Sequence, residues 1–392
     1  MLKKFFTTSS TPVQILQQAQ ALKRNKEIYE AIALLEQANQ QKKDSRLLHL
    51  LANFLLETGN YQRINQLDEI KAVDPRCYAI ASRLMNANLK NPEQLCTDGH
   101  EPLENVAYVS MVKDEEDIVL YNLIWHYRLG LRKFFVIDNM SKDSTAQQIK
   151  LFGQMFADAQ VFVLHDPVIA HYQGRKMTGA SRFVMAMWPE IEWLVLVDAD
   201  EMLSPTIPLN AVFADVPKAA EAIIVPKSVY YLVNGDATDN SDTFFNRIKY
   251  RKPLSYVSNK VIMRASSKVD ISQGNHRIFY QDGTEVKNYW SHRSLSYREF
   301  PIRSFSQYKS KMVNGGEAIV AAKKQGFEDV GGGHWQAVYN LYLQQGEDGL
   351  RKKMQAIIAN NSQIENIYDP FPMDKVLGSL SVKQKQLLAS LL

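Results

Sequence analysis

The chain has little cysteine and no long apolar run. Only Cys77 and Cys96 occur among 392 residues, so neither a disulfide framework nor a cluster of thiolate metal ligands organises the fold. No apolar stretch approaches the roughly 20 residues that span a bilayer. The opening segment, MLKKFFTTSS, lacks the apolar core of a secretory signal. We therefore expect a cytoplasmic protein in a reducing compartment.

A strong excess of one charge is also lacking. Lysine and arginine number 46, aspartate and glutamate 42, and the formal net charge is +4. This mild excess favours anionic ligands or an acidic membrane surface, and we expect no nucleic-acid partner. The hydrophobic fraction of 45% is that of a folded globular protein. A chain of this length accommodates a catalytic domain and an accessory domain.

The first hundred residues have helical spacing of apolar side chains. Leu47, Leu48, Leu51 and Leu55 recur at helical intervals, and a Gly-Asn pair then separates two amphipathic segments. The pair of segments resembles one tetratricopeptide unit. We predict an all-α helical-hairpin accessory domain over residues 1–100. It acts either as a plain helical cap or as a surface for a protein partner.

A different pattern begins near residue 105 and defines the predicted catalytic domain, residues 101–392. Apolar strand segments alternate with amphipathic helical segments as far as EWLVLVDADE, which ends at residue 201. This alternation predicts an α/β fold with a mostly parallel sheet flanked by helices. In such sheets ligands bind at the carboxyl ends of the strands. Further strands are predicted over residues 220–300, and helices over 297–358.

The last residues, VLGSLSVKQKQLLASLL, predict a short amphipathic helix. Two readings remain open for it. The helix packs on its own domain, or it makes a peripheral contact at the inner face of a membrane.

Two carboxylates, Asp198 and Asp200, directly follow the apolar run WLVLV. At a strand end that turns into a loop, both can converge on one hard cation, Mg²⁺ or Mn²⁺. Such an ion keeps open positions for phosphate oxygens. The adjacent Glu201 is a candidate catalytic residue, or it orients a ligand or holds the loop.

Another carboxylate, Asp138, lies at the end of the predicted strand KFFVIDN. At the same sheet edge it can accept hydrogen bonds from a base or from ribose hydroxyls. The alternative is a helix-capping turn. Lys113, at the end of the first strand, can meet a phosphate or remain a solvated lysine.

These segments resemble the glycosyltransferase family 2-like group with the GT-A fold, and are similar also to family 92. The resemblance runs through VSMVKDEEDIVLYNLIWHYRLGLRKFFVIDNMSKDST, then WLVLVDADEML, then NYWSHRSLSYREF. It implies that Asp138 and the first strand hold the nucleoside, that Asp198 and Asp200 hold the metal on the diphosphate, and that His292 is a third metal ligand. The remaining donor-binding residues expected on this basis are Lys113, Glu115, Lys176, Asp198, Arg293 and Lys309.

The predicted function is a metal-dependent glycosyltransferase. It moves a sugar from a nucleoside-diphosphate sugar, most simply a UDP-sugar, to a glycan, lipid-linked or polysaccharide acceptor, with inversion. The catalytic base is left open between Asp270 and His276, with Asp242 and Glu299 as further candidates. Two other classes remain: a nucleotidyl or phosphoryl transferase on a similar sheet, and a helical-repeat scaffold with an inactive transferase domain.

Overall fold

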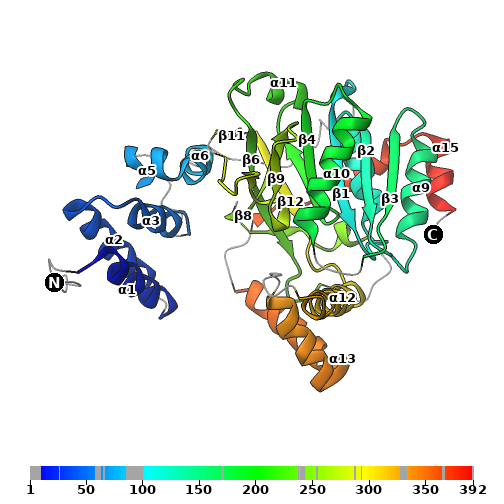
Figure 1. Ribbon diagram of the computed structural model, residues 1–392. Helices are drawn as coiled ribbons and strands as arrows, with labels where there is room; N and C mark the ends of the chain where they lie inside the picture. Colours follow the sequence, from blue (N-terminus) through cyan, green and yellow to red (C-terminus); the bar gives the residue numbers. More distant parts are fainter. Residues whose placement is uncertain are drawn as a thin grey trace. The chain divides into compact units, whose positions relative to one another are not determined.

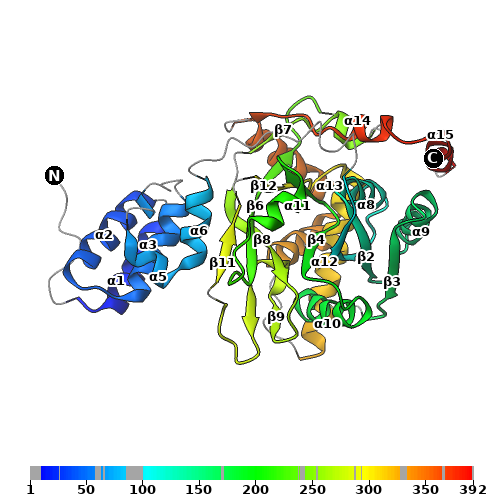
Figure 2. The same cartoon turned by 90° about the horizontal axis from the view of Figure 1, so that it is seen from above.

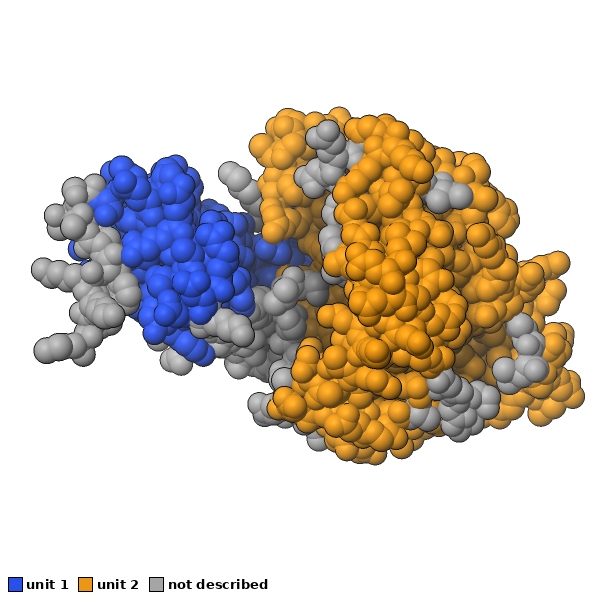
Figure 3. Space-filling model, turned by 90° about the horizontal axis from the view of Figure 1, so that it is seen from below, with its two compact units in different colours: residues 1–88, 219–224, 287–293 blue, residues 89–218, 225–286, 294–392 orange. Residues whose placement is uncertain are grey.

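The computed structural model describes residues 10–25, 27–57, 63–64, 67–84, 100–168, 172–236, 238, 243–252, 255–286, 288–292, 294–326, 333–363 and 367–390. The chain forms two compact units, which Figure 3 colours separately. Unit 1 comprises Met1–Asn88, Ala219–Ile224 and Lys287–Arg293, and unit 2 comprises Leu89–Lys218, Val225–Val286 and Ser294–Leu392. The sequence predicted a single cut near residue 100, whereas unit 1 also takes in two short segments of the later chain.

Figure 1 shows the chain with many of its helices and strands labelled. The described helices are α1 (Pro12–Arg24), α2 (Ile28–Gln41), α3 (Ser45–Glu57), α5 (Asp68–Val73), α6 (Pro75–Leu84), α8 (Val119–Arg128), α9 (Thr145–Met155), α10 (Gln173–Met187), α11 (Leu209–Ala214), α12 (Phe305–Lys324), α13 (Gly333–Asn361), α14 (Met373–Gly378) and α15 (Val382–Ala389), with 3₁₀ turns η1 (Phe244–Asn246) and η2 (Gln273–Asn275). The strands are β1 (Leu103–Val112), β2 (Leu131–Asp138), β3 (Gln160–His165), β4 (Trp193–Asp198), β5 (Glu201–Pro205), β6 (Ala222–Tyr231), β7 (Tyr250–Arg251), β8 (Ser255–Arg264), β9 (Val269–Ile271), β10 (Ile278–Tyr280), β11 (Tyr289–Ser291), β12 (Leu295–Glu299) and β13 (Ile367–Tyr368).

Unit 1 is built mainly of helices, as the apolar spacing predicts. Helix α1 begins with a capping box, in which Thr11 and Gln14 each accept a hydrogen bond from the other's main-chain N–H. Helix α3 buries the apolar face that carries Leu47 and Leu51. Helix α6 contacts β11, where Ser291 Oγ donates to the main-chain oxygen of Ala79 at 2.6 Å. The predicted Gly-Asn turn lies outside the described residues.

The central sheet has the strand order β13-β7-β6-β8-β4-β1-β2-β3. Strands β1 to β4 are mutually parallel, whereas β8 pairs with β4 in the antiparallel direction. Helices α8 and α10 lie on opposite faces of these parallel strands (Figure 2). Apolar side chains of β1 and β4 are therefore buried on both faces. The predicted α/β class with a mostly parallel sheet and flanking helices is confirmed.

Several predicted elements differ in their bounds. The segment EWLVLVDADE was predicted as one strand, but it is divided: β4 ends at Asp198, and β5 starts at Glu201. Asp198 is therefore the last residue of the buried strand, and Asp200 lies in the turn that follows. A strand, β12, also stands where residues 297–299 were predicted to be helical, because it pairs with both β5 and β6. Tertiary pairing overrides local helical spacing there.

The last helix, α15, packs on its own unit. It contacts α9, and Gln384 Nε2 donates to the main-chain oxygen of Met155 at 3.0 Å. This is the first of the two readings that its sequence allowed. Among the described residues, no helix combines the length and apolar character needed to cross a membrane.

Candidate active site

The carboxyl ends of three neighbouring parallel strands meet at one edge of the sheet. Strand β1 lies between β4 and β2, with Met111 in register with Asp198 and Val112 in register with Asp138. Two carboxylates therefore flank the end of β1, two strand spacings or about 10 Å apart. This is the edge at which parallel α/β sheets bind ligands.

Asp198 is held by three side chains from three different elements. Its Oδ1 accepts hydrogen bonds from Gln173 Nε2 at 2.7 Å and from Asn275 Nδ2 at 3.2 Å. Its Oδ2 is paired with the ammonium group of Lys260, which is 1% exposed. The Asp198 side chain itself keeps 30% of its surface exposed. It is therefore oriented from inside the protein and accessible from outside.

Glu201 is completely buried between two lysines. Lys227 Nζ lies 3.1 Å from its Oε1, and Lys260 Nζ lies 3.2 Å from its Oε2. Burial raises the pKa of Glu201 to about 7, although both lysines act to lower it. Lys227 also pairs with Glu299 at 2.9 Å. Because Glu201 is 0% exposed, it positions the two lysines rather than touching a substrate.

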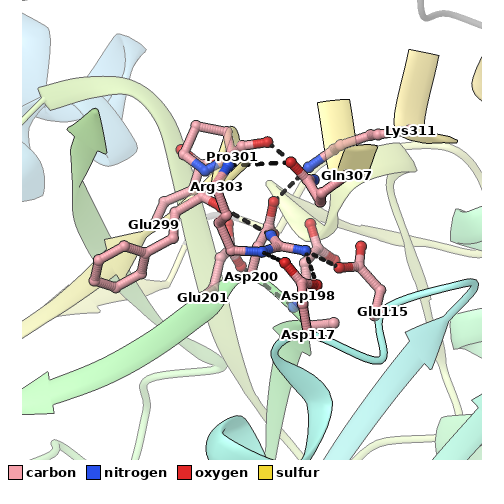
Figure 4. Close-up of polar contacts among 12 residues, drawn as sticks. Glu115, Asp117, Asp198, Asp200, Glu201, Glu299, Pro301, Arg303, Gln307 and Lys311 are labelled. Carbon is pink, nitrogen blue, oxygen red and sulfur yellow. Dashed lines mark hydrogen bonds and ion pairs between the residues drawn. The ribbon is translucent and has the colours of Figure 1, made fainter. Parts of the chain in front are cut away.

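Asp200 lies on the outer side of the same turn and is paired through Oδ2 with Lys311 of α12 (Figure 4). Burial acts to raise the pKa of Asp200, but Lys311 and Arg303 outweigh it and hold that pKa near 2. Arg303 is fully buried and donates to Asp117 at 2.7 Å and to Glu115 at 2.5 Å. The site turn, the loop after β1 and the start of α12 are thus joined by ion pairs.

Together these groups form the acidic cluster. It has six carboxylates, Glu115, Asp117, Asp198, Asp200, Glu201 and Glu299, and four cations, Lys227, Lys260, Arg303 and Lys311. Burial raises the pKa of Glu115, like that of Glu201, to about 7. The carboxylates outnumber the cations by two when all are ionised, so the cluster favours an additional positive charge.

The backbone around this edge adopts unusual conformations. Asp114, Met140 and Asn275 all have positive φ, at 51°, 57° and 56°, and they lie in the loops that meet at the site. Non-glycine residues in this region carry a conformational cost and concentrate at functional sites. Asn275 is fully buried, and in the part of the chain that the structure describes its Oδ1 has no hydrogen-bond partner. Its side chain therefore serves Asp198 from inside the protein, through the Nδ2 hydrogen bond.

A polar cavity of about 500 Å³ lies between the loop after β1 and the first turns of α12. Its wall includes Asp114, Lys142, Ser306, Ser310 and Asn314. Helix α12 therefore contributes hydroxyl and amide groups to the cavity and Lys311 to the acidic cluster. A volume of this size suits a small-molecule ligand.

Asp138 lies where the sequence placed it, at the end of β2 and 5% exposed. Its Oδ1 accepts the Ser141 main-chain N–H at 3.0 Å, and His165 Nδ1 lies 3.4 Å from its Oδ2. Lys113, predicted to meet a phosphate, instead donates to the main-chain oxygens of Asn139 and Met140 at 3.1 and 3.0 Å. It fixes the loop after β2. Asp138 also fixes this loop, through its hydrogen bond from Ser141. Its contact with the nucleoside stays a prediction.

Other predicted donor-binding residues have partners elsewhere. Lys176 is bound to Asp166 at 2.5 Å and to the main-chain oxygen of Val168 at 2.8 Å. Lys309 forms an exposed ion pair with Glu347 of α13. Neither ammonium group belongs to the acidic cluster. The sequence places several basic residues after His292, but it does not show which of them faces the acidic cluster. Residues two positions apart on a helix lie on different faces, and it is Lys311, not Lys309, that reaches Asp200.

The two candidate bases lie in different environments. Asp270 is half exposed and pairs with Arg182 at 2.6 Å on the surface. His276 follows Asn275, and its Nδ1 lies 2.5 Å from the main-chain oxygen of Asn259. Burial, with help from Lys260, lowers the pKa of His276 to about 4. Its imidazole is therefore neutral at pH 7, with Nδ1 donating and Nε2 left as the acceptor.

The remaining predicted residues do not enter the described cluster. His292 is buried and belongs to unit 1, so its role as a third metal ligand stays a prediction. Arg293 and Asp242 lie outside the described residues. Among the residues that are described, no three His, Cys, Asp or Glu side chains gather as a ready metal site.

Sequence reasoning missed the residues that hold Asp198. Lys260 lies in the strand segment NKVIMR, where a lysine reads as a solvated surface residue, and Gln173 and Asn275 lie in turn-rich segments. Antiparallel pairing of β8 with β4 brings Lys260 under the site. The one signal in the sequence was a lysine at the edge of an otherwise apolar strand.

The donor set fits a divalent cation in one respect and opposes it in another. Carboxylate oxygens are the ligands that Mg²⁺ and Mn²⁺ prefer, and in the acidic cluster six carboxyl groups face four cations. However, each aspartate is already paired with an ammonium group: Asp198 with that of Lys260, and Asp200 with that of Lys311. A metal therefore fits at Asp200 if Lys311 moves away from it.

No family model and no curated protein matches the chain. The chain is similar to the solved structure of S. aureus TarS 1–349 in complex with UDP, with 11% identity, 72% of this chain and 83% of that chain covered, and a TM-score of 0.31. It is also similar to the mannosyltransferase PcManGT from Pyrobaculum calidifontis in complex with GDP-Man and Mn²⁺, with 13% identity, 88% and 97% covered, and a TM-score of 0.34. TM-scores this low carry no conclusion about activity. The fold itself defines an α/β protein with a cluster of charged side chains at the carboxyl edge of its parallel strands.

Proposed function

We propose that the chain is a glycosyltransferase that uses a nucleoside-diphosphate sugar. The observation that carries the proposal is the placement of Asp138 and Asp198 on the two sides of the β1 end, in register with Val112 and Met111. A donor that lies across this edge meets one carboxylate with its nucleoside and the other with its diphosphate. The polar cavity of about 500 Å³ next to this edge can hold part of such a ligand.

The nucleoside end of the donor is assigned to Asp138. This carboxylate is oriented by the Ser141 N–H, and it can accept hydrogen bonds from a base N–H or from ribose hydroxyls. The base is most simply uracil, in a UDP-sugar. Glu115 supports this region indirectly, because it is paired with Arg303, which holds the loop after β1.

The diphosphate end is assigned to Asp198, Asp200 and the cations around them. A Mn²⁺ or Mg²⁺ ion held by Asp198 and Asp200 would neutralise charge that develops on the leaving diphosphate. Lys260 and Lys227 are buried beneath the turn. Their ion pairs with Asp198, Glu201 and Glu299 fix these carboxyl groups in position.

His276 is the catalytic base that we propose for the acceptor hydroxyl. Its Nδ1 is committed to the Asn259 carbonyl oxygen, so Nε2 is the atom that accepts the proton. Asp270 is the alternative base. It lies in an exposed ion pair with Arg182, where the arginine competes for its charge. Inversion at the anomeric carbon and a glycan, lipid-linked or polysaccharide acceptor rest on the family resemblance alone.

The test is the identity of the small product. Nucleotide sugars are incubated with the protein and the divalent ions, and the nucleotide products are separated chromatographically. Release of a nucleoside diphosphate supports sugar transfer or slow donor hydrolysis. Release of pyrophosphate would assign the site to nucleotidyl transfer. Failure of every nucleotide to bind would leave a scaffold with an inactive domain.

A further inference from the structure

The four cations of the acidic cluster differ in how firmly they are held. Lys260 contacts two carboxylates and is 1% exposed, and Lys227 contacts two and is 5% exposed. Arg303 is 0% exposed and is held by Glu115 and Asp117. None of these three can leave without stranding buried charges, which is strongly unfavourable.

Lys311 is held differently. Among the residues that the structure describes, its ion pair is with Asp200 alone, and its side chain keeps 24% of its surface exposed. Its ammonium group sits at the end of a flexible four-carbon stem, so it can leave Asp200 by rotation of the side chain, without backbone movement. Ser306, Ser310 and Asn314 of the same helix line the polar cavity.

If Lys311 leaves Asp200, the carboxyl groups of the acidic cluster also lose one of their four cations. With Lys311 absent, six carboxylates of the cluster face three cations. Asp200 is 5% exposed, so solvent does little to stabilise its charge. A buried carboxylate that has lost its ion partner is unfavourable, and a bound cation would relieve that cost.

We propose that Lys311 is an exchangeable internal cation that competes with a divalent metal ion for Asp200. Without a donor the ammonium group occupies the place of the metal at this carboxylate. When the metal binds, Lys311 turns away and its charge becomes available to an anionic donor. This inference rests on the proposed function for the identity of the donor, but the exchange at Asp200 is testable without any nucleotide.

The experiment measures binding of Mn²⁺ alone to the full-length protein, by titration calorimetry and by the loss of the free-ion EPR signal. Lys311→Met should bind Mn²⁺ at least about tenfold more tightly than the wild type, because the competing charge is gone. Mn²⁺ should also raise the melting temperature of Lys311→Met more than that of the wild type. Adding Asp200→Asn to Lys311→Met should remove both effects.

The matched control is Lys323→Met on the same helix. Lys323 is exposed and donates to Gln336, so its removal should leave Mn²⁺ affinity unchanged. Equal Mn²⁺ affinity of Lys311→Met and the wild type would overturn the inference, as would an equal gain in Lys323→Met. A separate titration of the wild type with UDP and GDP, with Mn²⁺ present, tests the proposed function. Absence of nucleotide binding there, with the metal results as expected, would overturn the glycosyltransferase assignment and not the exchange.

Discussion

Arg303 Nε donates to Asp117 Oδ2 at 2.7 Å, and the two residues are 186 positions apart in the chain. This hydrogen bond links the segment before α12 to the loop after β1. Arg303 Nη1 also donates to the main-chain oxygen of Phe300 at 2.9 Å. This edge of the sheet is therefore assembled from segments of unit 2 that lie far apart in the chain. The ion pairs of Arg303 stabilise the site because they fix both segments at once.

Replacement of Arg303 should destabilise unit 2 strongly. Arg303→Met leaves Glu115 and Asp117 without their buried partner, and we expect a loss of ~3–5 kcal/mol in the free energy of unfolding. The matched control is Arg182→Met, which breaks the exposed pair with Asp270 and should cost less than ~1 kcal/mol. Urea unfolding followed by tryptophan fluorescence measures both. Equal losses in the two variants would show that the Arg303 network is not a stabilising element.

Asp138 should contribute to nucleotide binding. Asp138→Ala should weaken binding of a nucleoside diphosphate by ~1.5–3 kcal/mol, the value of a charge-assisted hydrogen bond. The control is Asp158→Ala at the opposite edge of the sheet, where Asp158 pairs with Arg132. Calorimetric titration of both variants is the measurement. Unchanged affinity in Asp138→Ala would leave this residue only its structural bond to Ser141.

The choice of base can be settled with two variants. His276→Ala should lower kcat by a factor of roughly 10² to 10⁴, the usual worth of general base catalysis, while nucleotide affinity stays the same. Asp270→Asn should change kcat little, because Asp270 is half exposed and paired with Arg182. Steady-state rates with a competent acceptor are compared. A large loss in Asp270→Asn with full activity in His276→Ala would reverse the assignment.

Buried His126 should make unfolding depend on pH. Leu203 N–H donates to its Nε2 at 3.3 Å, and its Nδ1 lies 2.8 Å from the Asn122 carbonyl oxygen. Burial lowers the pKa of His126 from 6.5 to about 4. As the pH falls through this range, the unfolded state takes up the proton first, so stability decreases by up to ~3 kcal/mol.

The control for this prediction is His126→Gln, which removes the titrating group. Burial raises the pKa of Glu115 and Glu201, which acts in the opposite direction, but equally in both proteins. The difference in unfolding free energy between wild type and variant should therefore shrink as the pH falls from about 7 to about 4. A difference that is constant with pH would contradict the neutral assignment of His126.

The sequence predicted the parallel core of the sheet because β1, β2 and β3 are apolar runs that are each followed by an amphipathic helix, and β4 is a fourth apolar run. It also predicted which edge carries Asp138 and Asp198, since both residues end such strands. It could not predict the contacts of Asp198. Those come from Lys260 on an antiparallel strand and from Gln173 and Asn275 on distant segments, and no local pattern records long-range pairing.

The predicted roles of single lysines were the least reliable. Lys113 and Lys309 were expected at the donor, but Lys113 binds main-chain oxygens and Lys309 binds Glu347. A lysine side chain is long and flexible, so its position in the sequence does not determine which oxygen it reaches. Lys311, two residues after Lys309, forms the ion pair with Asp200 instead.

The most direct test of the account is release of nucleoside diphosphate from nucleotide sugars by the wild type, by Asp198→Asn and by Asp200→Asn. Asp158→Asn serves as the control. We expect measurable release by the wild type and the control from at least one nucleotide sugar. Release should be at least about a hundredfold slower in each of the two site variants, because preplaced charge at the diphosphate supplies much of the rate. Wild-type rates in both site variants, or no release from any nucleotide sugar by the wild type, would contradict the proposed function.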